Sequence, residues 1–324
     1  MLKVALVGLG WWGRTILGLL QGSRKLEVVR RVDPAVHEQG VTHDLDDALK
    51  DPAVQGVILC TPHSLHAGQI VKAAQAKKHV FCEKPLSLAR ADVLAAVDAC
   101  NRNGVTLAVG HEKRFEPPVQ EVFRLVADGA LGRLLQVEAN FSQDKFLSLP
   151  PDNWRLSPLE APAGPMTATG IHLLDLSVGL LGQADNVLAR VRQLDSPLAN
   201  GDTLAILASF KNGSSALISA ILATPFEGRF AVYGSRGWAE VRDKAHPENP
   251  QGWTLTMSFR DGRKEAKDYP PSKAVLANLE AFAEAAQGGK PYPVPQAQMI
   301  DNIAALEAVF KSARSGRIES VVNE

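Results

Sequence analysis

Residues 2–13 of the chain read LKVALVGLGWWG. The first six are apolar apart from one lysine and predict a strand buried on both faces, as in a parallel sheet. Three glycines follow at the spacing Gly-x-Gly-x-x-Gly, namely Gly8, Gly10 and Gly13, and the next residues predict a helix. Such glycines allow a tight turn and let a pyrophosphate approach the helix N-terminus closely. We therefore expect a dinucleotide-binding fold, in which Trp11 and Trp12 pack against the core or the adenine ring.

An acidic residue ends the second predicted strand. Asp33 follows Leu26–Val32 and lies where dinucleotide-binding folds carry the carboxylate that binds the adenosine ribose. A carboxylate there repels a 2′-phosphate, so we expect NAD rather than NADP. Arg30 and Arg31 lie beside it on opposite faces of the strand, and because one of them could bind a 2′-phosphate, NADP stays open.

Segments typical of strands and helices alternate through the first third of the chain. The predicted strands are Leu2–Val7, Leu26–Val32, Gly56–Cys60, His79–Cys82 and Val105–Val109. The predicted helices between them are Arg14–Leu20, Asp44–Lys50, Leu65–Ala76 and Leu88–Asn101. This alternation implies right-handed crossovers and a doubly wound parallel sheet. We expect an α/β Rossmann domain over residues 1–118.

Later strands follow one another without helices between them. They are Leu134–Phe141, Val187–Leu194, Thr203–Phe210, Ser214–Ile221, Arg229–Tyr233 and Trp253–Phe259, with hairpin signals at residues 211–213 and 234–237. We expect an α+β domain over residues 119–324, built on a large, open-faced, mostly antiparallel sheet. Helices Ile171–Leu181, Ala274–Ala286 and Ile300–Ser312 would cover one face. The other face would be open or paired with a second subunit, giving a homodimer or homotetramer.

Two short motifs follow predicted strands of the first domain. Residues 60–66 read CTPHSLH, and residues 80–86 read VFCEKPL. Together with residues 110–115, Trp154-Arg155, residues 170–175 and residues 305–317, they resemble the Gfo/Idh/MocA oxidoreductase family, with its TPxxxH and EKP motifs. The resemblance covers nearly the whole chain. It implies hydride transfer between a nicotinamide cofactor and a sugar, cyclitol or related hydroxy or keto compound, bound between a Rossmann domain and an open-faced sheet domain.

The motifs and the resemblance together predict two sets of site residues. Those expected at the cofactor are Gly8, Gly10, Trp11, Trp12, Gly13, Asp33, Thr61, Pro62, His66, Glu83, Lys84 and Arg114. Those expected at the substrate are Lys84, Trp154, Arg155, Thr169, His172 and Asp175. For His66, a structural role at the start of a helix is the alternative to a cofactor contact.

Three of these residues are predicted to be catalytic: Lys84, His172 and Asp175. Lys84 ends a buried strand, at the edge where doubly wound sheets bind ligands, and its ammonium can stabilise a developing alkoxide. His172 suits proton transfer near neutral pH, and Asp175, three residues later on the same helix face, could orient it or bind a substrate hydroxyl. An exposed lysine and a structural His–Asp pair are the alternatives. We also expect a cis peptide bond between Lys84 and Pro85.

One position departs from the family pattern. The family often carries an aspartate four residues before the histidine, where this chain has Ala168 between Thr167 and Thr169. Neither hydroxyl replaces a carboxylate base, so we expect rates to depend more on Lys84 than on His172. A non-catalytic dinucleotide-binding regulator is the second interpretation, and the presence of Lys84 and His172 favours an enzyme.

Composition limits the remaining possibilities. Lys and Arg together number 35, as do Asp and Glu, so the net charge gives no reason to expect nucleic acid or a membrane as partner. The three cysteines form no CxxC pair, and no histidine or cysteine spacing indicates a metal site. With no signal peptide or membrane span indicated, we expect a cytoplasmic protein. His37, His43 and His246 are expected on the surface.

Overall fold

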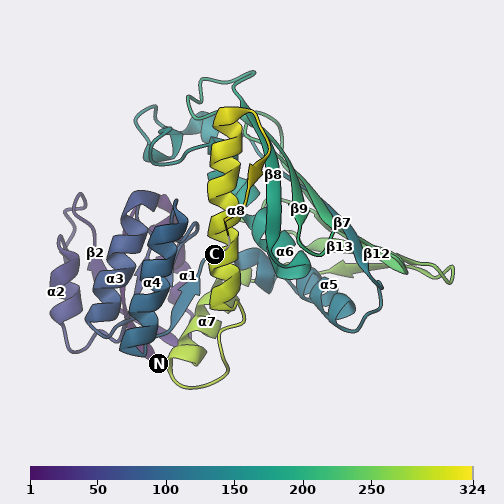
Figure 1. Cartoon of the computed structure of the whole chain (residues 1–324). Coiled ribbons are helices and arrows are strands. Elements are labelled where there is room, and N and C mark those ends of the chain that lie inside the picture. The colour runs from purple at the N-terminus through teal and green to yellow at the C-terminus, as the bar shows by residue number, and fades with distance from the viewer. Residues whose placement is uncertain (323–324) are drawn as a thin grey trace. The chain divides into compact units, whose positions relative to one another are not determined.

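The computed structural model describes residues 1–322, which form two compact units (Figure 1). The first unit consists of Met1–Glu112 and Lys273–Ile303, and the second of Lys113–Ser272 and Ala304–Glu324. The first break lies close to the predicted boundary after residue 118, and the domain bounds 1–118 and 119–324 stay a prediction. The return of Lys273–Ile303 to the first unit is not indicated by the sequence.

The first unit contains a six-stranded sheet in which every pair of neighbours is parallel. Its strands are β1 (Leu2–Val7), β2 (Leu26–Val32), β3 (Val41–Thr42), β4 (Gly56–Leu59), β5 (His79–Cys82) and β6 (Leu107–Val109). The strand order is β3-β2-β1-β4-β5-β6, so the direction of winding reverses between β1 and β4. This is the predicted Rossmann arrangement, and such a reversal point is where doubly wound sheets bind ligands.

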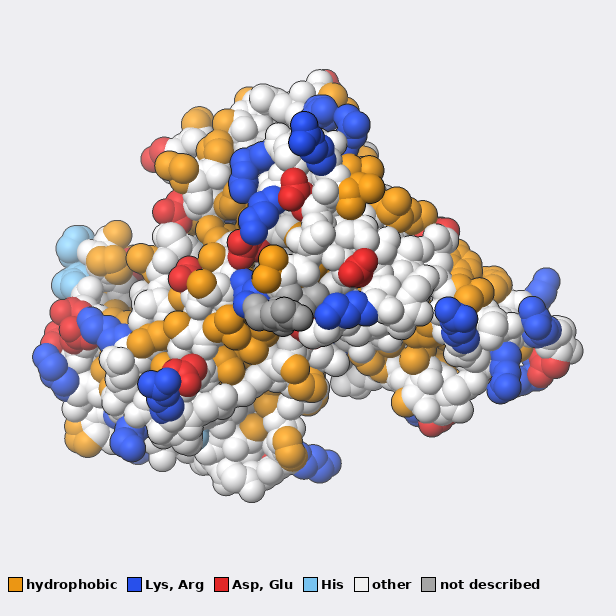
Figure 2. Space-filling model, viewed as in Figure 1, with side chains coloured by type: hydrophobic (Ala, Val, Ile, Leu, Met, Phe, Trp, Pro, Cys, Tyr) orange, Lys and Arg blue, Asp and Glu red, His pale blue; other side chains and the backbone are white. Residues whose placement is uncertain are grey.

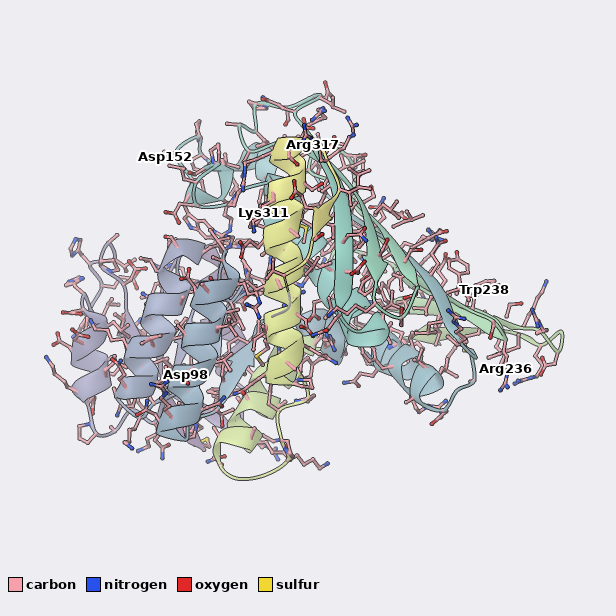
Figure 3. The ribbon with its side chains drawn as sticks, viewed as in Figure 1. Asp98, Asp152, Arg236, Trp238, Lys311 and Arg317 are labelled. Atoms are coloured by element: carbon pink, nitrogen blue, oxygen red, sulfur yellow. The ribbon has the colours of Figure 1, made fainter. Side chains whose placement is uncertain are left out.

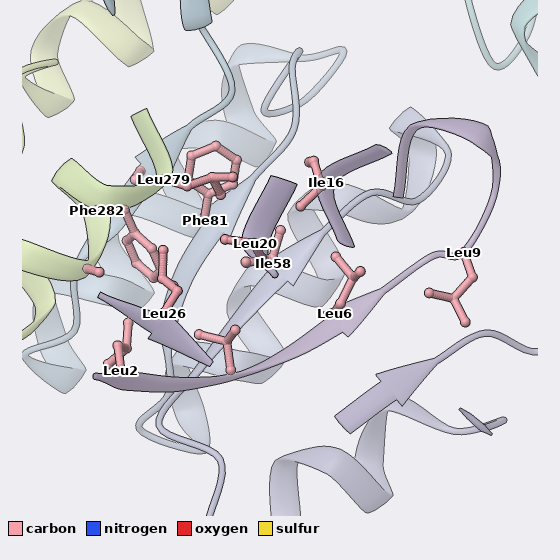
Figure 4. Packing of buried hydrophobic residues seen from close by; sticks show 13 residues of the cluster. Leu2, Leu6, Leu9, Ile16, Leu20, Leu26, Ile58, Phe81, Leu279 and Phe282 are labelled. Carbon is pink, nitrogen blue, oxygen red and sulfur yellow. The ribbon is translucent and has the colours of Figure 1, made fainter. Parts of the chain in front are cut away.

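Helices pack around this sheet. They are α1 (Trp11–Leu20), α2 (Leu45–Lys50), α3 (His66–Gln75), α4 (Arg90–Asn103) and α7 (Ala274–Ala286). Apolar side chains of α1 and α7 meet those of β1, β4 and β5 in one buried cluster that includes Ile16, Ile58, Phe81, Leu279 and Phe282 (Figure 4).

The position of α7 corrects one prediction. The sequence assigned Ala274–Ala286 to the second sheet, but Phe282 packs against Phe81 of the first sheet, with ring centroids 5.9 Å apart. The apolar periodicity of a helix shows that one of its faces is buried, but it does not show which sheet buries that face.

The second unit contains a nine-stranded sheet in the order β14-β13-β12-β11-β7-β10-β9-β8-β15. The strands are β7 (Leu134–Ser142), β8 (Ala184–Arg192), β9 (Thr203–Phe210), β10 (Ser215–Ile221), β11 (Glu227–Gly234), β12 (Gly237–Asp243), β13 (Trp253–Phe259), β14 (Lys264–Tyr269) and β15 (Glu319–Ser320). Only β7 and β10 pair in parallel among the described strands of this sheet, which confirms the predicted mostly antiparallel sheet. Both predicted hairpins are present, as β9–β10 and β11–β12.

Three further helices belong wholly or partly to the second unit: α5 (Pro117–Ala127), α6 (Ile171–Leu181) and α8 (Gln296–Ser315). The helix α6 packs against β7 and β10, as expected. A π-helical turn, Met166–Gly170, leads directly into it. Near the other end of the chain, the hydroxyl of Ser312 on α8 accepts a hydrogen bond from the backbone N–H of Ala189 on β8.

Candidate functional site

The glycine-rich turn after β1 leaves open space at the start of α1. Gly8 has φ +91°, and a Cβ there would lie 2.6 Å from the carbonyl oxygen of Cys60. A Cβ on Gly13 would lie 1.9 Å from the carbonyl oxygen of Gly8, whereas a Cβ on Gly10 would meet nothing within 4 Å. The fold itself therefore requires the first and third glycines. The space over Gly10 fits the close backbone approach of a pyrophosphate to a helix N-terminus.

The carboxylate of Asp33 is fixed beside this turn. Its Oδ2 accepts a hydrogen bond from the backbone N–H of Leu9 at 2.7 Å, and its Oδ1 accepts one from Ala35 at 2.8 Å. The residue is partly exposed. This hydrogen bond holds the expected ribose-binding carboxylate beside the glycine-rich turn, as a dinucleotide site requires.

The arginines near Asp33 already have acidic partners. Arg30 turns away to Asp51, with Nε and Oδ2 2.6 Å apart. Glu38 lies 2.6 Å from Nη2 of Arg14 and 3.9 Å from Nη1 of Arg31. A 2′-phosphate would have to compete with Glu38 for these two guanidinium groups, and this arrangement fits NAD better than NADP.

The two tryptophans of the turn differ in burial. Trp12 packs against the core cluster of the first unit. Trp11 is 48% exposed, and its ring centroid lies 5.7 Å from that of Trp12. An adenine contact is therefore open to Trp11 and stays a prediction.

His66 joins the TPxxxH segment to the EKP segment. Its Nδ1 lies 2.7 Å from the carbonyl oxygen of Pro85, and its Nε2 lies 3.0 Å from that of Thr61. The side chain is fully buried; burial lowers the pKa of His66, while the two carbonyl oxygens act in the opposite direction. With both ring nitrogens facing backbone oxygens, the imidazole has no nitrogen left for the cofactor. This geometry favours the structural alternative for His66.

Lys84 follows a buried carboxyl group. Glu83 is 7% exposed, and burial, aided by the charge of Glu112, raises its pKa to about 7. Its Oε2 lies 3.3 Å from the backbone nitrogen of Lys84, which donates to it. Lys84 is half-buried, and its peptide bond to Pro85 is cis, which confirms that prediction.

Arg114 and Asp175 form a buried ion pair within the second unit. Nε of Arg114 lies 2.6 Å from Oδ2 of Asp175, and Nη2 lies 3.0 Å from Oδ1. Nη2 also donates to the backbone oxygen of Asp175 at 2.8 Å. The sequence did not pair these residues, because they lie 61 positions apart. A double hydrogen bond of this kind restrains both side chains and holds Arg114 against α6, and this geometry favours the structural alternative for Asp175.

His172 is buried beside an aromatic cluster that the sequence did not indicate. The ring centroid of Phe141 lies 6.1 Å from the ring centroids of both His172 and His246. The ammonium of Lys113 lies 5.1 Å from the same Phe141 centroid. Nε2 of His246 lies 2.7 Å from Oε1 of Gln143. His172, Phe141 and His246 come from three separate segments, so only the fold brings them together.

His246 corrects the expectation of a surface histidine. Its side chain is only 16% exposed, and its ring also packs against Phe226, 5.4 Å away. Burial, followed by the positive charges of Lys145 and Lys113, lowers its pKa to about 4. Its polar sequence neighbours concealed this burial, because long-range packing rather than local composition produces it. His37 and His43 are exposed, as expected.

The remaining predicted substrate residues lie on two segments of the second unit. The guanidinium of Arg155 lies 4.3 Å from the ring centroid of Trp154, next to it in a short 3₁₀ helix. In the π-helical turn, Thr169 is buried and its hydroxyl donates to the carbonyl oxygen of Pro165 at 3.3 Å. Ala168 is the residue of this turn that is partly exposed. The position at which the family often has aspartate thus reaches the surface of the unit, whereas Thr169 faces inward.

Residues 1–322 contain no group of three or more His, Cys, Asp and Glu side chains placed to hold a metal ion. Within the same range, no helix has the length and apolar character needed to span a membrane.

Sequence comparison assigns both halves of the chain. Residues 2–111 match the oxidoreductase family with an NAD-binding Rossmann fold, and residues 119–240 match the GFO/IDH/MocA C-terminal domain. The chain belongs to the Gfo/Idh/MocA oxidoreductase family. The family and fold class expected from the sequence are confirmed, and the protein is an NAD(P)-dependent oxidoreductase.

Three members of the family illustrate the similarity. The uncharacterized oxidoreductase YrbE of Bacillus subtilis is 30% identical over 230 residues, which cover 68% of this chain and 64% of YrbE. D-xylose 1-dehydrogenase (NADP(+)) 2 of Haloferax volcanii is 27% identical over 271 residues, covering 83% of this chain and 81% of that protein. The crystal structure of aldose-aldose oxidoreductase from Caulobacter crescentus, complexed with glycerol, has a TM-score of 0.85 at 26% identity and covers 98% of this chain and 99% of that one.

Proposed function

We propose that this family member transfers hydride between NAD(H) and a polyhydroxylated small molecule, a sugar or cyclitol or the corresponding keto compound. One observation carries the proposal: the loops after β1, β4 and β5 adjoin at the reversal point of the parallel sheet, and Lys84 lies on the last of them. The names of two relatives, a D-xylose dehydrogenase and an aldose-aldose oxidoreductase, support the substrate class.

Lys84 and His172 share the proton chemistry in this proposal. Oxidation of an alcohol carbon removes a hydride and leaves a carbonyl group, so the hydroxyl proton must leave as well. The nicotinamide, when bound, accepts the hydride. The ammonium of Lys84 stabilises the substrate oxygen while negative charge develops on it, and the imidazole of His172 receives the proton. The assignment rests on the sequence motifs and on the surroundings of each residue within its own unit.

In this proposal Asp175 and Arg114 contact neither substrate nor cofactor and instead hold His172 in place. Because both carboxylate oxygens of Asp175 already accept hydrogen bonds from Arg114, the pair holds α6, and with it His172, in place. Direct contact of Asp175 with substrate, or of Arg114 with cofactor, is the weaker interpretation, since it requires this buried pair to separate. Trp154 and Arg155 remain the proposed substrate contacts of the second unit.

Kinetics on single variants test the catalytic roles. Absorbance of NADH is followed with a panel of sugars, cyclitols and keto-sugars, first with the wild type and then with Lys84→Ala and His172→Ala. We expect Lys84→Ala to lower kcat at least roughly 10²-fold with nucleotide binding kept, and His172→Ala to lower it less. Lys50→Ala, a change of an exposed lysine on α2, is the control. Near-normal turnover in Lys84→Ala would contradict the role of Lys84, whereas no turnover of any substrate by the wild type would favour a regulatory protein.

The preference for NAD rests on Asp33. Replacement of its carboxylate by Asp33→Ala removes the ribose acceptor together with the repulsion of a 2′-phosphate. We therefore expect this variant to lose affinity for NADH and to lose less for NADPH, as measured by fluorescence titration. Tighter binding of NADPH than of NADH by the wild type would contradict the assignment.

We also propose that the outward face of the nine-stranded sheet joins subunits into a homodimer or homotetramer. Leu188, Leu207 and Leu217 pair across β8, β9 and β10, and so form an apolar row on this face. Leu207 is 44% exposed and Leu217 is 41% exposed. A row of exposed leucines on a sheet favours a partner surface. The cytoplasmic location stays a prediction from the sequence.

A further inference from the structure

A cavity of about 350 Å³ lies within the second unit. The loop at Pro158, the end of β8 and the last turn of α8 line it. Val191 and Phe310 contribute apolar surface. A space of this size holds a molecule comparable to a single sugar ring. None of the residues predicted to contact cofactor or substrate lines it, so it is a different site from the one proposed for hydride transfer.

Two arginines line this cavity from separate elements. Arg192 ends β8, Arg314 lies in the last turn of α8, and both side chains are exposed. Within residues 1–322, neither lies within ion-pair distance of a carboxylate. Nη1 of Arg192 donates to the carbonyl oxygen of Val191 at 2.9 Å, which leaves its Nη2 and Nε groups for a ligand.

Two exposed arginines on other helices have acidic partners one turn away. Arg102 pairs with Asp98, and Arg124 pairs with Asp128. The residue four positions before Arg314 is Phe310, so α8 offers no such carboxylate there. Figure 2 shows several Lys and Arg side chains, with Asp and Glu among them, over the C-terminal end of α8, where Figure 3 labels Arg317. The positive charge that favours an anion is therefore that of Arg192 and Arg314, which line the cavity without an ion-pair partner among residues 1–322.

Asn200 connects the cavity wall to the segment that carries Trp154 and Arg155. Its Nδ2 donates to the carbonyl oxygens of Arg155 at 2.8 Å and Ala161 at 2.9 Å. The backbone carbonyl oxygen of Asn200 accepts a hydrogen bond from the backbone N–H of Gly164 at 2.7 Å. Asn200 is 6% exposed, so these bonds are shielded from water. A ligand held against this wall therefore also restrains the segment from residue 154 to residue 164.

We propose that this cavity binds a small organic anion of sugar size, a sugar phosphate or sugar carboxylate, as an effector. Guanidinium groups bind phosphate and carboxylate oxygens through paired N–H donors, and the apolar side chains cover the ring carbons. Binding orders the segment that carries Trp154 and Arg155. The effect on substrate affinity rests on the proposed function, whereas the binding itself does not. By linkage, substrate and anion then change each other's affinity by the same factor.

Calorimetry in the absence of dinucleotide tests the binding. The probes are D-glucose 6-phosphate, D-gluconate and uncharged D-glucose. We expect the phosphate, the carboxylate or both to bind at least about tenfold more tightly than glucose, and the Arg192→Ala/Arg314→Ala variant to lose at least about tenfold in affinity for them. Arg317→Ala removes the same charge just beyond the cavity lining and should change affinity less than about twofold. Amide hydrogen exchange over residues 154–164 should slow on binding.

The outcomes separate this proposal from the proposed function. An anion bound at the hydride-transfer site would keep its affinity in the Arg192→Ala/Arg314→Ala variant, and that result would overturn the cavity as the binding site. Equal affinity for glucose and both anions, or no binding of any probe at millimolar concentration, would also overturn it. The calorimetric titration contains no dinucleotide and therefore does not depend on turnover. Failure of the proposed function, as judged from Lys84→Ala, would leave the measured anion affinity unchanged. Binding of only one anion supports the proposal and identifies the acidic group that the cavity accepts.

Discussion

Nδ1 of His66 lies 2.7 Å from the carbonyl oxygen of Pro85, the residue that follows Lys84. Nε2 lies 3.0 Å from the carbonyl oxygen of Thr61. A neutral imidazole donates through one nitrogen only, and the shorter contact indicates that Nδ1 carries the proton. We therefore predict that His66 positions Lys84 through the backbone of Pro85.

Two substitutions separate the two contacts of His66. Asn places its amide nitrogen near Nδ1 and keeps the hydrogen bond to Pro85, whereas Gln places it near Nε2, beside the carbonyl oxygen of Thr61, and loses the bond to Pro85. We expect His66→Gln to lower kcat roughly tenfold to a hundredfold, His66→Asn to lower it less, and NADH affinity to change little in either. A merely structural role would lower thermal stability equally in both variants without this difference in kcat. Steady-state kinetics with parallel thermal unfolding checks it.

The buried carboxyl of Glu83 makes stability depend on pH. Its pKa is raised from 4.5 to about 7, so between these values the folded protein binds a proton that the unfolded chain releases. The contribution of Glu83 to the free energy of unfolding is therefore highest below pH 4.5 and falls as the pH rises through 7, by roughly 3 kcal/mol in total. We expect Glu83→Gln to remove this loss.

Urea unfolding at several pH values measures the effect. The difference in free energy of unfolding between Glu83→Gln and wild type should grow in favour of the variant between about pH 5 and about pH 8. Glu27→Gln changes an exposed carboxyl on β2 and is the matched control. A pH-independent difference between Glu83→Gln and the wild type would mean that Glu83 is ionised throughout this range.

The buried pair Arg114–Asp175 predicts a loss of stability rather than of substrate affinity. The side chains are 8% and 2% exposed, so Asp175→Asn leaves a buried guanidinium without its charge partner. We expect the free energy of unfolding to fall by about 3–5 kcal/mol. Asp128→Asn removes one of the two acidic partners of Arg124 on the surface and should lower the free energy of unfolding far less than Asp175→Asn does. A variant Asp175→Asn of normal stability but raised KM would instead assign Asp175 to the substrate.

The sequence predicted local features better than long-range partners. The glycine spacing correctly predicted the turn between β1 and α1 and its place in a Rossmann fold, because that information lies within one continuous segment. The strand Lys264–Tyr269 escaped prediction because all but its last residue are exposed, so an edge strand rich in charge shows no apolar alternation. The pairing of Asp175 with Arg114 and the burial of His246 depend on segments far apart in the chain. Apolar periodicity alone also left α7 on the wrong sheet.

The open space over Gly10 predicts a selective effect on cofactor binding. A methyl group there meets no protein atom within 4 Å, so Gly10→Ala should fold as well as the wild type. It would occupy the position of the pyrophosphate and should weaken NADH binding at least about tenfold. Gly18→Ala, at an equally open position of α1, should keep NADH affinity and raise stability by about 1 kcal/mol. Unchanged NADH affinity in Gly10→Ala would place the pyrophosphate elsewhere.

The leucine row on the nine-stranded sheet predicts how the assembly can be broken. Leu207 lies between Leu188 and Leu217 in the register of β8, β9 and β10, and therefore at the centre of the row. A lysine there would bury an unpaired charge in any interface formed by this face, so Leu207→Lys should yield monomers. Leu159→Lys makes the same change at a leucine that is 87% exposed and outside the sheet, and it should leave the assembly intact. Light scattering at micromolar concentration distinguishes the two variants. A monomeric wild type, or equal dissociation by both variants, would remove this face as the subunit interface.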